Sequence, residues 1–168
     1  MIVSIIGLGY IGLPTAAVLA SKDIKVVGVD VSQHVVDTIN QGKIHIIEPS
    51  LDALVREAVQ KNHLKAVINP EKADVFMIAV PTPFKGNHEP DLSYIRLAAK
   101  AIAPVLEKGN LVILESTSPV GATEKMMTWM REERLDLSFP EFGNNNFIAD
   151  IAVAHCPERV LPGQVVRE

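Results

Sequence analysis

Three glycines near the N terminus constrain the fold more than any other feature of the chain. Gly7, Gly9 and Gly12 have the spacing G-x-G-x-x-G, and they stand between the β-rich run Ile2–Ile6 and a helix-forming segment over residues 11–21. This context is typical of a phosphate-binding turn. The first glycine allows a tight bend, the second lets the backbone approach a pyrophosphate, and the third lets the helix pack against the strand. The alternative is a strand-to-helix turn without a ligand, because glycines at this spacing also occur by chance.

The residues around this turn predict a dinucleotide, and specifically NAD. The backbone amides of Tyr10 and Ile11 lie where unpaired N–H groups and the positive end of the helix dipole would face phosphates. Asp30 ends the next predicted strand, 18 residues after the last glycine of the turn. A carboxylate there accepts hydrogen bonds from ribose hydroxyls and repels a 2′-phosphate, and residues 31–34 hold no Lys or Arg to offset that repulsion. We therefore expect NAD rather than NADP, unless Asp30 only caps a helix, a role for which Ser32 is better placed.

The remaining sequence alternates between strand and helix patterns. Residues 74–80 form a nearly unbroken apolar run, as in a parallel strand that is buried on both faces, and Ser50 and Asp91 are placed to cap helices. The expected strands are residues 2–6, 25–30, 64–68, 74–80, 111–115 and 151–155, and the expected helices are residues 11–21, 33–40, 51–60, 92–107 and 123–134. This alternation predicts an α/β fold, a Rossmann-like doubly wound parallel sheet of about six strands with helices on both faces.

Length and composition limit the possible functions. The 168 residues suit one domain, of which 48% are hydrophobic, and a net charge of −4 gives no electrostatic reason to bind nucleic acid or an anionic membrane. No apolar run approaches the roughly 20 residues of a membrane-spanning helix. A lone cysteine and an N terminus that reads as a strand rather than a signal peptide predict a cytoplasmic protein. The last segment, residues 156–168, has no closing signal, so we expect a fragment cut at a domain boundary.

Three polar segments follow predicted strands, where open parallel sheets bind their ligands. Thr82 stands between two prolines and offers a hydroxyl to the cofactor, or is only solvated in a stiff loop. Thr117 is placed to meet the nicotinamide ribose or the reacting group, whereas Thr123 either contacts the cofactor or caps the next helix. Glu158 and Arg159 follow the last strand, and from spacing alone they are as well explained as solvated charges.

Four of these motifs together resemble one enzyme family. They are residues 7–14, 80–83, 116–121 and 157–163, and in this order they are similar to the N-terminal NAD-binding domain of the nucleotide-sugar 6-dehydrogenases, the UDP-glucose/GDP-mannose dehydrogenase family. The resemblance covers essentially the whole chain. Residues 44–49, 83–90 and 157–164 resemble the branch of that family that acts on UDP-N-acetyl-D-mannosamine in polysaccharide biosynthesis.

The resemblance implies a reaction and roles for several residues. The sugar 6-hydroxyl would be oxidised to a carboxylate with two NAD, through a thioester on a cysteine. By motif position, Thr117 and Glu158 match residues beside the reaction centre, and Glu158 would orient or activate water. Arg159 and Val160, together with Glu158, match positions that contact the UDP-sugar substrate, and Thr82, Thr117 and Thr123 match positions near NAD. The full-length protein would be a homodimer, with a central helix and a UDP-sugar domain absent from residues 1–168.

Two departures from the family pattern limit which substrate we expect and where we expect the catalytic residues. UDP-glucose dehydrogenases carry a second acid four residues after the glutamate that matches Glu158, and Pro162 stands there in this chain, which favours an N-acetylated sugar. Cys156 precedes that glutamate and is not at the position of the family's nucleophile, so we expect the catalytic cysteine and lysine to lie beyond residue 168. No metal is expected, because the histidines lack a ligand spacing: His34, His45, His63, His88 and His155.

Several functional hypotheses therefore stay open. The first is the cofactor domain of an enzyme that oxidises UDP-N-acetyl-D-mannosamine to its uronate, and this fragment alone would be inactive. UDP-N-acetylglucosamine is an alternative substrate. The remaining alternatives are an NAD-binding module without chemistry of its own and a different NAD-dependent hydroxyacid dehydrogenase.

Overall fold

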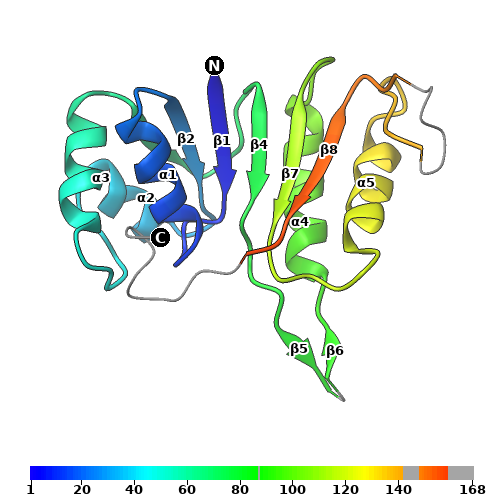
Figure 1. Cartoon of the computed structure of the whole chain (residues 1–168), viewed down its shortest axis with the longest axis horizontal. Coiled ribbons are helices and arrows are strands. Elements are labelled where there is room, and N and C mark those ends of the chain that lie inside the picture. Colours follow the sequence, from blue (N-terminus) through cyan, green and yellow to red (C-terminus); the bar gives the residue numbers. More distant parts are fainter. Residues whose placement is uncertain (87, 142–147, 159–168) are drawn as a thin grey trace.

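The described residues of the computed structural model are 1–86, 88–141 and 148–158. In this part of the chain, six parallel strands form one sheet in the order β3-β2-β1-β4-β7-β8 (Figure 1). The strands are β1 (Ile2–Ile6), β2 (Lys25–Val29), β3 (Leu64–Val67), β4 (Val75–Ile78), β7 (Leu111–Glu115) and β8 (Ala152–Cys156). The chain starts in the middle of the sheet, runs to the β3 edge, returns beside β1 and continues to the β8 edge. This reversal is the doubly wound topology that the alternating pattern predicted, and it is confirmed.

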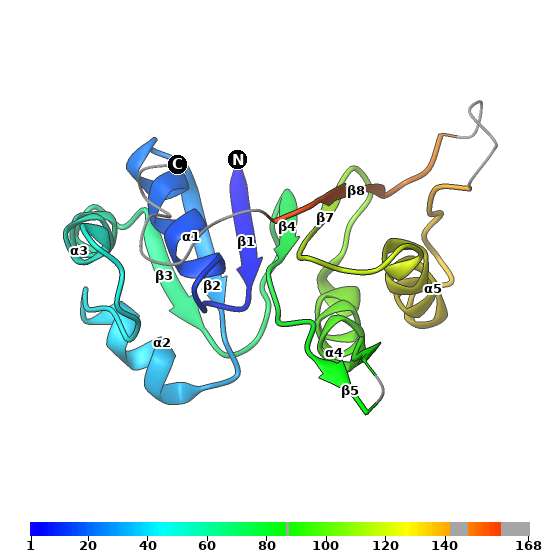
Figure 2. The same ribbon diagram turned by 60° about the horizontal axis from the view of Figure 1, so that its bottom comes forward.

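Helices cover both faces of this sheet, as expected. They are α1 (Gly12–Ser21), α2 (Gln33–Asn40), α3 (Leu51–Gln60), α4 (Ser93–Ile102) and α5 (Ala122–Glu133). Side chains of α1, α2 and α3 pack in one cluster with Val3 and Ile5, and side chains of α4 and α5 pack in a second cluster with Phe76 and Ile78. Figure 2 shows α1 on one side of the sheet, and α4 and α5 on the other. After their first residue, β1 and β2 are buried on both faces, whereas β4 and β7 alternate between buried and half-buried residues, so the full burial expected for residues 74–80 is only partly met.

The ends of the helices differ in part from the expectation. Asp91 Oδ1 accepts a hydrogen bond from the amide of Ser93, the first residue of α4 (2.9 Å), although the residue directly before the helix is Leu92 and not Asp91. Ser32 and Ser50 precede α2 and α3, but neither hydroxyl bonds to its helix, so their capping role was wrong. The helix expected to reach residue 107 ends at Ile102 and continues as a 3₁₀ turn, η1 (Ala103–Val105), because Pro104 has no N–H to continue the α-helical ladder.

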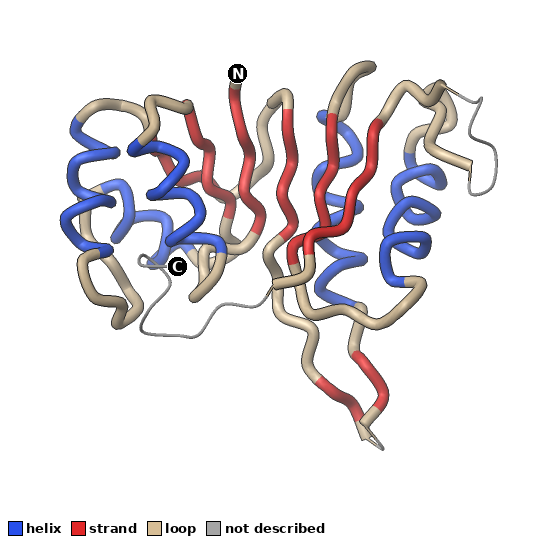
Figure 3. Tube along the Cα trace, in the orientation of Figure 1, coloured by secondary structure: helices blue, strands red, loops and turns tan. Residues whose placement is uncertain are grey.

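A short hairpin replaces the loop expected after β4. Strands β5 (Phe84–Lys85) and β6 (Glu89–Pro90) pair antiparallel and project from the carboxyl edge of the sheet (Figure 3). The Phe84 ring meets the edge of His88 with 6.1 Å between centroids, and Lys85 Nζ lies 2.8 Å from Asp91 Oδ1. Two-residue strands carry no alternating pattern, so periodicity does not reveal this hairpin.

Within the described residues, none of the helices combines the length and apolar character needed to cross a membrane.

Candidate dinucleotide-binding site

The carboxyl ends of five strands, β1, β2, β4, β7 and β8, border one cavity of about 410 Å³. Its lining comes from the turn after β1, from Asp30 after β2, and from the segments after β4, β7 and β8. Eight residues expected to bind cofactor or substrate line it: Gly7, Gly9, Tyr10, Ile11, Asp30, Thr82, Thr117 and Glu158. The fold therefore brings together side chains that are up to 151 positions apart in the sequence (158 − 7).

Two glycines of the turn are required by its geometry. Gly7 has a φ of +94°, and a Cβ there would lie 2.6 Å from the carbonyl oxygen of Ala79, the residue directly after β4. Its amide donates to the Val29 carbonyl (2.8 Å), which ties the turn after β1 to the end of β2. A Cβ on Gly12 would lie 1.8 Å from the Gly7 carbonyl oxygen, far inside contact distance. Gly12 does not line the cavity; it allows α1 to pack close to β1, as the spacing predicted.

The start of α1 fits an anionic group. No atom of the described residues lies within 4 Å of the position that a Cβ would take on Gly9, so the backbone there is open with respect to that part of the chain. The helix has no side-chain cap at Ile11 and no acidic residue in its first turn. Its first N–H groups and its positive dipole end are therefore available to a phosphate. This is the fit expected for the pyrophosphate of a dinucleotide.

Asp30 holds the turn in place and still has capacity for a ligand. Its Oδ2 accepts from the Leu8 amide (3.0 Å) and its Oδ1 accepts from the Ser32 amide (2.9 Å). These bonds tie the phosphate turn to Ser32, the residue before α2, so Asp30 holds the two loops together but does not cap α2. A carboxylate offers about four lone-pair sites. The remaining two suit the adjacent hydroxyls of a ribose.

His45 lies close enough to this acid for their charges to interact. Burial lowers the pKa of the His45 imidazole below 6.5, and the charge of Asp30 opposes that shift. The neutral form is therefore favoured beside the proposed ribose position. Residues 44–49 were noted only as a resemblance motif, and nothing in the sequence pattern indicated that His45 lies near Asp30.

The loops after β4 and β7 are joined by a hydrogen bond. Thr82 Oγ1 donates to the Thr117 carbonyl (3.0 Å), and both residues line the cavity. With its proton used in this bond, the Thr82 hydroxyl can still accept a hydrogen bond from a ligand. Thr82 is therefore not merely solvated in a stiff loop, and its contact with the cofactor stays a prediction.

Two carboxyl groups lie at the opposite end of the cavity from Asp30. Glu158 was expected there, whereas Glu115, the last residue of β7, was not singled out. Burial raises the pKa of the Glu115 carboxyl above 4.5, and the negative charge of Glu158 raises it further. The signal for Glu115 in the sequence is a glutamate that ends a strand at the ligand edge of a parallel sheet, directly before the hydroxyl residues.

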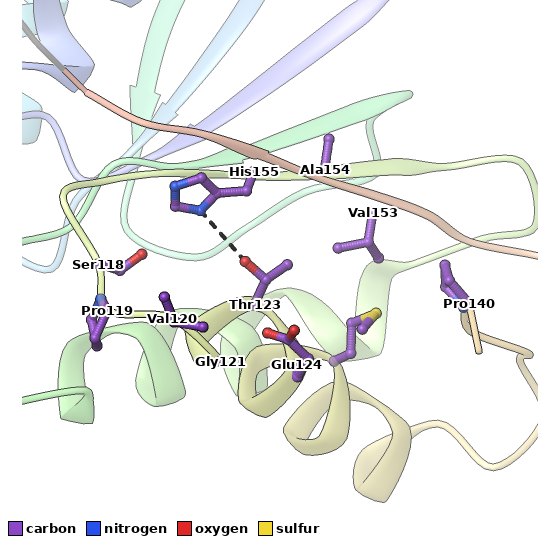
Figure 4. Close-up of a pocket in the computed structure, with 11 residues that line it drawn as sticks. Ser118, Pro119, Val120, Gly121, Thr123, Glu124, Pro140, Val153, Ala154 and His155 are labelled. Atoms are coloured by element: carbon purple, nitrogen blue, oxygen red, sulfur yellow. Dashed lines mark hydrogen bonds between the residues drawn. The ribbon is translucent and has the colours of Figure 1, made fainter. Parts of the chain in front are cut away.

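Thr123 lies in a neighbouring cavity instead. That cavity, of about 400 Å³, is formed by the start of α5, by β8 and by Pro140. Thr123 Oγ1 points toward His155 and lies 3.4 Å from its Nδ1 (Figure 4). The structure thus does not bring Thr123 together with the eight residues above, and its contact with a cofactor stays a prediction. Arg159 and Val160 lie outside the described residues.

Comparison with known proteins decides the family. Residues 1–168 match the NAD-binding domain of the UDP-glucose/GDP-mannose dehydrogenase family. The chain belongs to this family. It is 66% identical, over 99% of its length and 40% of the relative's, to UDP-N-acetyl-D-mannosamine dehydrogenase of Campylobacter jejuni. It is 64% identical, over 99% of its length and 39% of the relative's, to NDP-N-acetyl-D-galactosaminuronic acid dehydrogenase of Ralstonia nicotianae.

A solved structure agrees with this assignment. UDP-D-ManNAc dehydrogenase from Pyrococcus horikoshii superposes with a TM-score of 0.88 and 41% identity, over 98% of this chain and 38% of that one. The present chain thus spans about 40% of the length of the relatives that it matches. The predictions of the fold, the family and NAD as cofactor are confirmed, whereas the roles of individual residues stay predictions.

Proposed function

We propose that this chain is the cofactor-binding part of an NAD-dependent dehydrogenase that oxidises UDP-N-acetyl-D-mannosamine to UDP-N-acetyl-D-mannosaminuronate. The observation that carries this proposal is the single cavity that joins the phosphate turn to Thr117 and Glu158. Relatives named for that sugar, at 60–66% identity over nearly the whole chain, support the choice of substrate. The central helix and sugar domain that the resemblance implies would complete the cleft.

In this proposal, the residues of this chain bind NAD and orient a water molecule. NAD supplies the hydride acceptor when it is bound. The open backbone at Gly9 and the start of α1 would hold its pyrophosphate, and Asp30 would accept hydrogen bonds from the adenosine ribose. Thr82 and Thr117 would fix the loops beside the nicotinamide ribose. Glu158 would orient the water whose oxygen enters the product carboxylate.

The overall reaction sets what the rest of the protein must provide. Conversion of a primary alcohol to a carboxylate removes two hydrides and adds one water oxygen, with release of three protons at neutral pH. The family resemblance implies that a cysteine thiolate holds the carbon between the two oxidations. The single cysteine of this chain, Cys156, is exposed at the end of β8. We therefore assign the nucleophile to the part of the relatives' length that these 168 residues do not cover.

A second substrate class is supported by one comparison. The 64% identity to an NDP-N-acetyl-D-galactosaminuronic acid dehydrogenase is nearly as high as the identity to the mannosamine enzymes. The N-acetylated sugar is common to both names, while UDP-N-acetylglucosamine is the further alternative from the sequence. Selectivity among these sugars would depend mainly on residues outside this chain.

The experiment is turnover of the full-length protein with NAD and a panel of UDP-sugars. We expect two NADH formed per UDP-N-acetyl-D-mannosamine, with slower turnover of the galacto and gluco isomers and of UDP-glucose. Faster turnover of another N-acetylated sugar would change the substrate and keep the reaction. Absence of NADH with every sugar, while NAD still binds, would support a binding module without chemistry. The 168-residue chain by itself should bind NAD weakly and oxidise none of them.

Two further expectations belong to the full-length protein. We infer that it is a homodimer in the cytoplasm, with no role for nucleic acid or membrane. Light scattering of the purified full-length protein tests the first expectation, and fractionation of cells tests the second.

A further inference from the structure

The nicotinamide end of the cavity carries two carboxyl groups. β7 and β8 pair in parallel with Glu115 opposite Cys156, and Glu158 follows two residues later. Strand pairing thus places both glutamates at the same edge of the sheet, and both line the cavity. The negative charge of Glu158 helps to raise the pKa of Glu115, so the two carboxyl groups lie close enough for their charges to interact.

The surroundings of Glu115 point to a ligand. Among the described residues, its Oε2 is buried without a hydrogen-bond partner, and so is the Oγ of Ser116. Ser116 is only 5% exposed and lines the same cavity. Buried polar groups are normally paired, so these two orphaned atoms at a cavity wall are where a bound molecule would supply partners.

The orientation of the dinucleotide follows from the other end of the site. Asp30 lies at the end of β2, and the phosphate turn follows β1. A dinucleotide lies across the carboxyl ends of such a sheet, with one half on each side of the point where the strand order reverses. With the adenosine ribose at Asp30, the nicotinamide half must lie over β4, β7 and β8. The ring is therefore on the side of Glu115.

We propose that Glu115, together with Glu158, makes this cavity selective for the oxidised cofactor, so that NAD⁺ binds more tightly than NADH. The nicotinamide ring of NAD⁺ carries a positive charge, which is lost when the ring accepts a hydride. A nearby carboxylate attracts the charged ring and has no such attraction for the neutral one. The effect would favour exchange of NADH for NAD⁺ after each oxidation. The inference depends on the cofactor alone and not on the proposed sugar.

The titration of Glu115 gives the selectivity a pH dependence. Burial and Glu158 both keep Glu115 protonated to higher pH than an exposed glutamate. The attraction for NAD⁺ appears only as Glu115 loses its proton, so NAD⁺ affinity should rise with pH through that pKa. NADH affinity should not rise, because its ring is neutral. Bound NAD⁺ should in turn promote loss of the proton from Glu115.

The experiment measures the Kd of both cofactors with the wild-type protein and with Glu115→Gln, by calorimetry and by NADH fluorescence. We expect the ratio of Kd(NADH) to Kd(NAD⁺) to fall roughly tenfold in Glu115→Gln, which corresponds to about 1.4 kcal/mol. Glu132→Gln on the exposed surface of α5 is the matched control, because it removes the same charge far from the cavity wall and should leave the ratio unchanged.

Other outcomes separate this proposal from its alternatives. Asp30→Asn should weaken both cofactors similarly and leave the ratio intact, since it acts on the adenosine end. An equal loss of NAD⁺ and NADH affinity in Glu115→Gln, or no loss of either, would overturn the proposal. If that variant does not fold, the wild-type protein still decides, because an NAD⁺ to NADH preference that stays flat as the pH rises from about 4 to about 8 contradicts it. Failure of sugar turnover would not affect any of these results.

Discussion

The two ends of the cavity are built by different means. At the β1–β2 end, recognition depends on the backbone: a bend at Gly7, an open approach at Gly9, and the N–H groups of an uncapped helix. At the β4–β7–β8 end it depends on side chains, namely the hydroxyl of Thr82 and the carboxyl groups of Glu115 and Glu158. The backbone end is nearly complete within this chain. The side-chain end still requires a bound substrate and a nucleophile. We assign the nucleophile to residues outside the chain.

This difference explains how each end responds to substitution. A backbone site tolerates no added atom at its tight glycines, so a methyl group there alters the fold itself. A side-chain site tolerates an isosteric change and loses only the hydrogen bond or charge that was removed. We therefore expect effects on stability at the first end to exceed those at the second.

Gly12→Ala should have the largest effect. The new Cβ would lie 1.8 Å from the Gly7 carbonyl oxygen, and that oxygen belongs to backbone that cannot rotate away. Either α1 shifts from β1 or the turn opens, and we expect a loss of about 3 kcal/mol or more in the free energy of unfolding. Urea denaturation measures it. A loss below about 1 kcal/mol would mean that the contact between turn and helix is looser than the structure has it.

Gly9→Ala is the matched control within the same turn. Within residues 1–86, 88–141 and 148–158, no atom lies within 4 Å of its Cβ position, so the free energy of unfolding should change by less than about 0.5 kcal/mol. The methyl group would nevertheless occupy the space expected for the pyrophosphate. Calorimetry should show NAD affinity reduced by roughly tenfold or more, equivalent to about 1.4 kcal/mol. Retained affinity would indicate that the pyrophosphate does not approach Gly9.

Asp30→Ala should weaken NAD binding by about 1–3 kcal/mol, the scale for hydrogen bonds to a charged group. The variant removes the ribose acceptor and also releases the amides of Leu8 and Ser32. NADP should lose less affinity than NAD, because repulsion of its 2′-phosphate disappears with the carboxylate. Asp37→Ala, at an exposed position of α2, provides the control. Unchanged NAD affinity would leave Asp30 with a purely structural role.

The same contrast explains what could be predicted from the sequence. Strands buried on both faces appear as apolar runs, and a glycine turn has a spacing that sterics impose, so the sheet and the phosphate turn were found. The β5–β6 hairpin was missed because its strands have two residues each. Glu115 was missed because the shift of its pKa depends on burial and on Glu158, which is 43 positions away (158 − 115). Such neighbours are set by strand order, which no local pattern contains.

Thr82→Val tests the side-chain end with a smaller change. It removes the donor to the Thr117 carbonyl and keeps the shape of the side chain. Because the bond is exposed, we expect about 0.5 kcal/mol less stability, and a roughly threefold weaker NAD affinity from loosening of the loop after β7. Thr128→Val on α5, whose hydroxyl donates to the Glu124 carbonyl, removes a similar bond away from the cavity. Equal NAD affinities in the two variants would mean that the Thr82 bond does not shape the site.

The smallest effect concerns acid stability at the base of the hairpin. Hydrogen bonds from Lys85 and Ser93 lower the pKa of Asp91 from 3.8 to about 2. A group whose pKa is lowered by folding stabilises the native state above its unfolded pKa, and this contribution is lost as pH falls through the folded pKa. Stability should therefore decline between pH about 4 and about 2, and Asp91→Asn should lack that part of the decline. Urea midpoints followed by the fluorescence of Trp129, which packs beside the α4–α5 core, measure it. The same acid slope in both proteins would assign the decline to other carboxylates of that half, such as Asp136, whose pKa Arg134 also lowers to about 2.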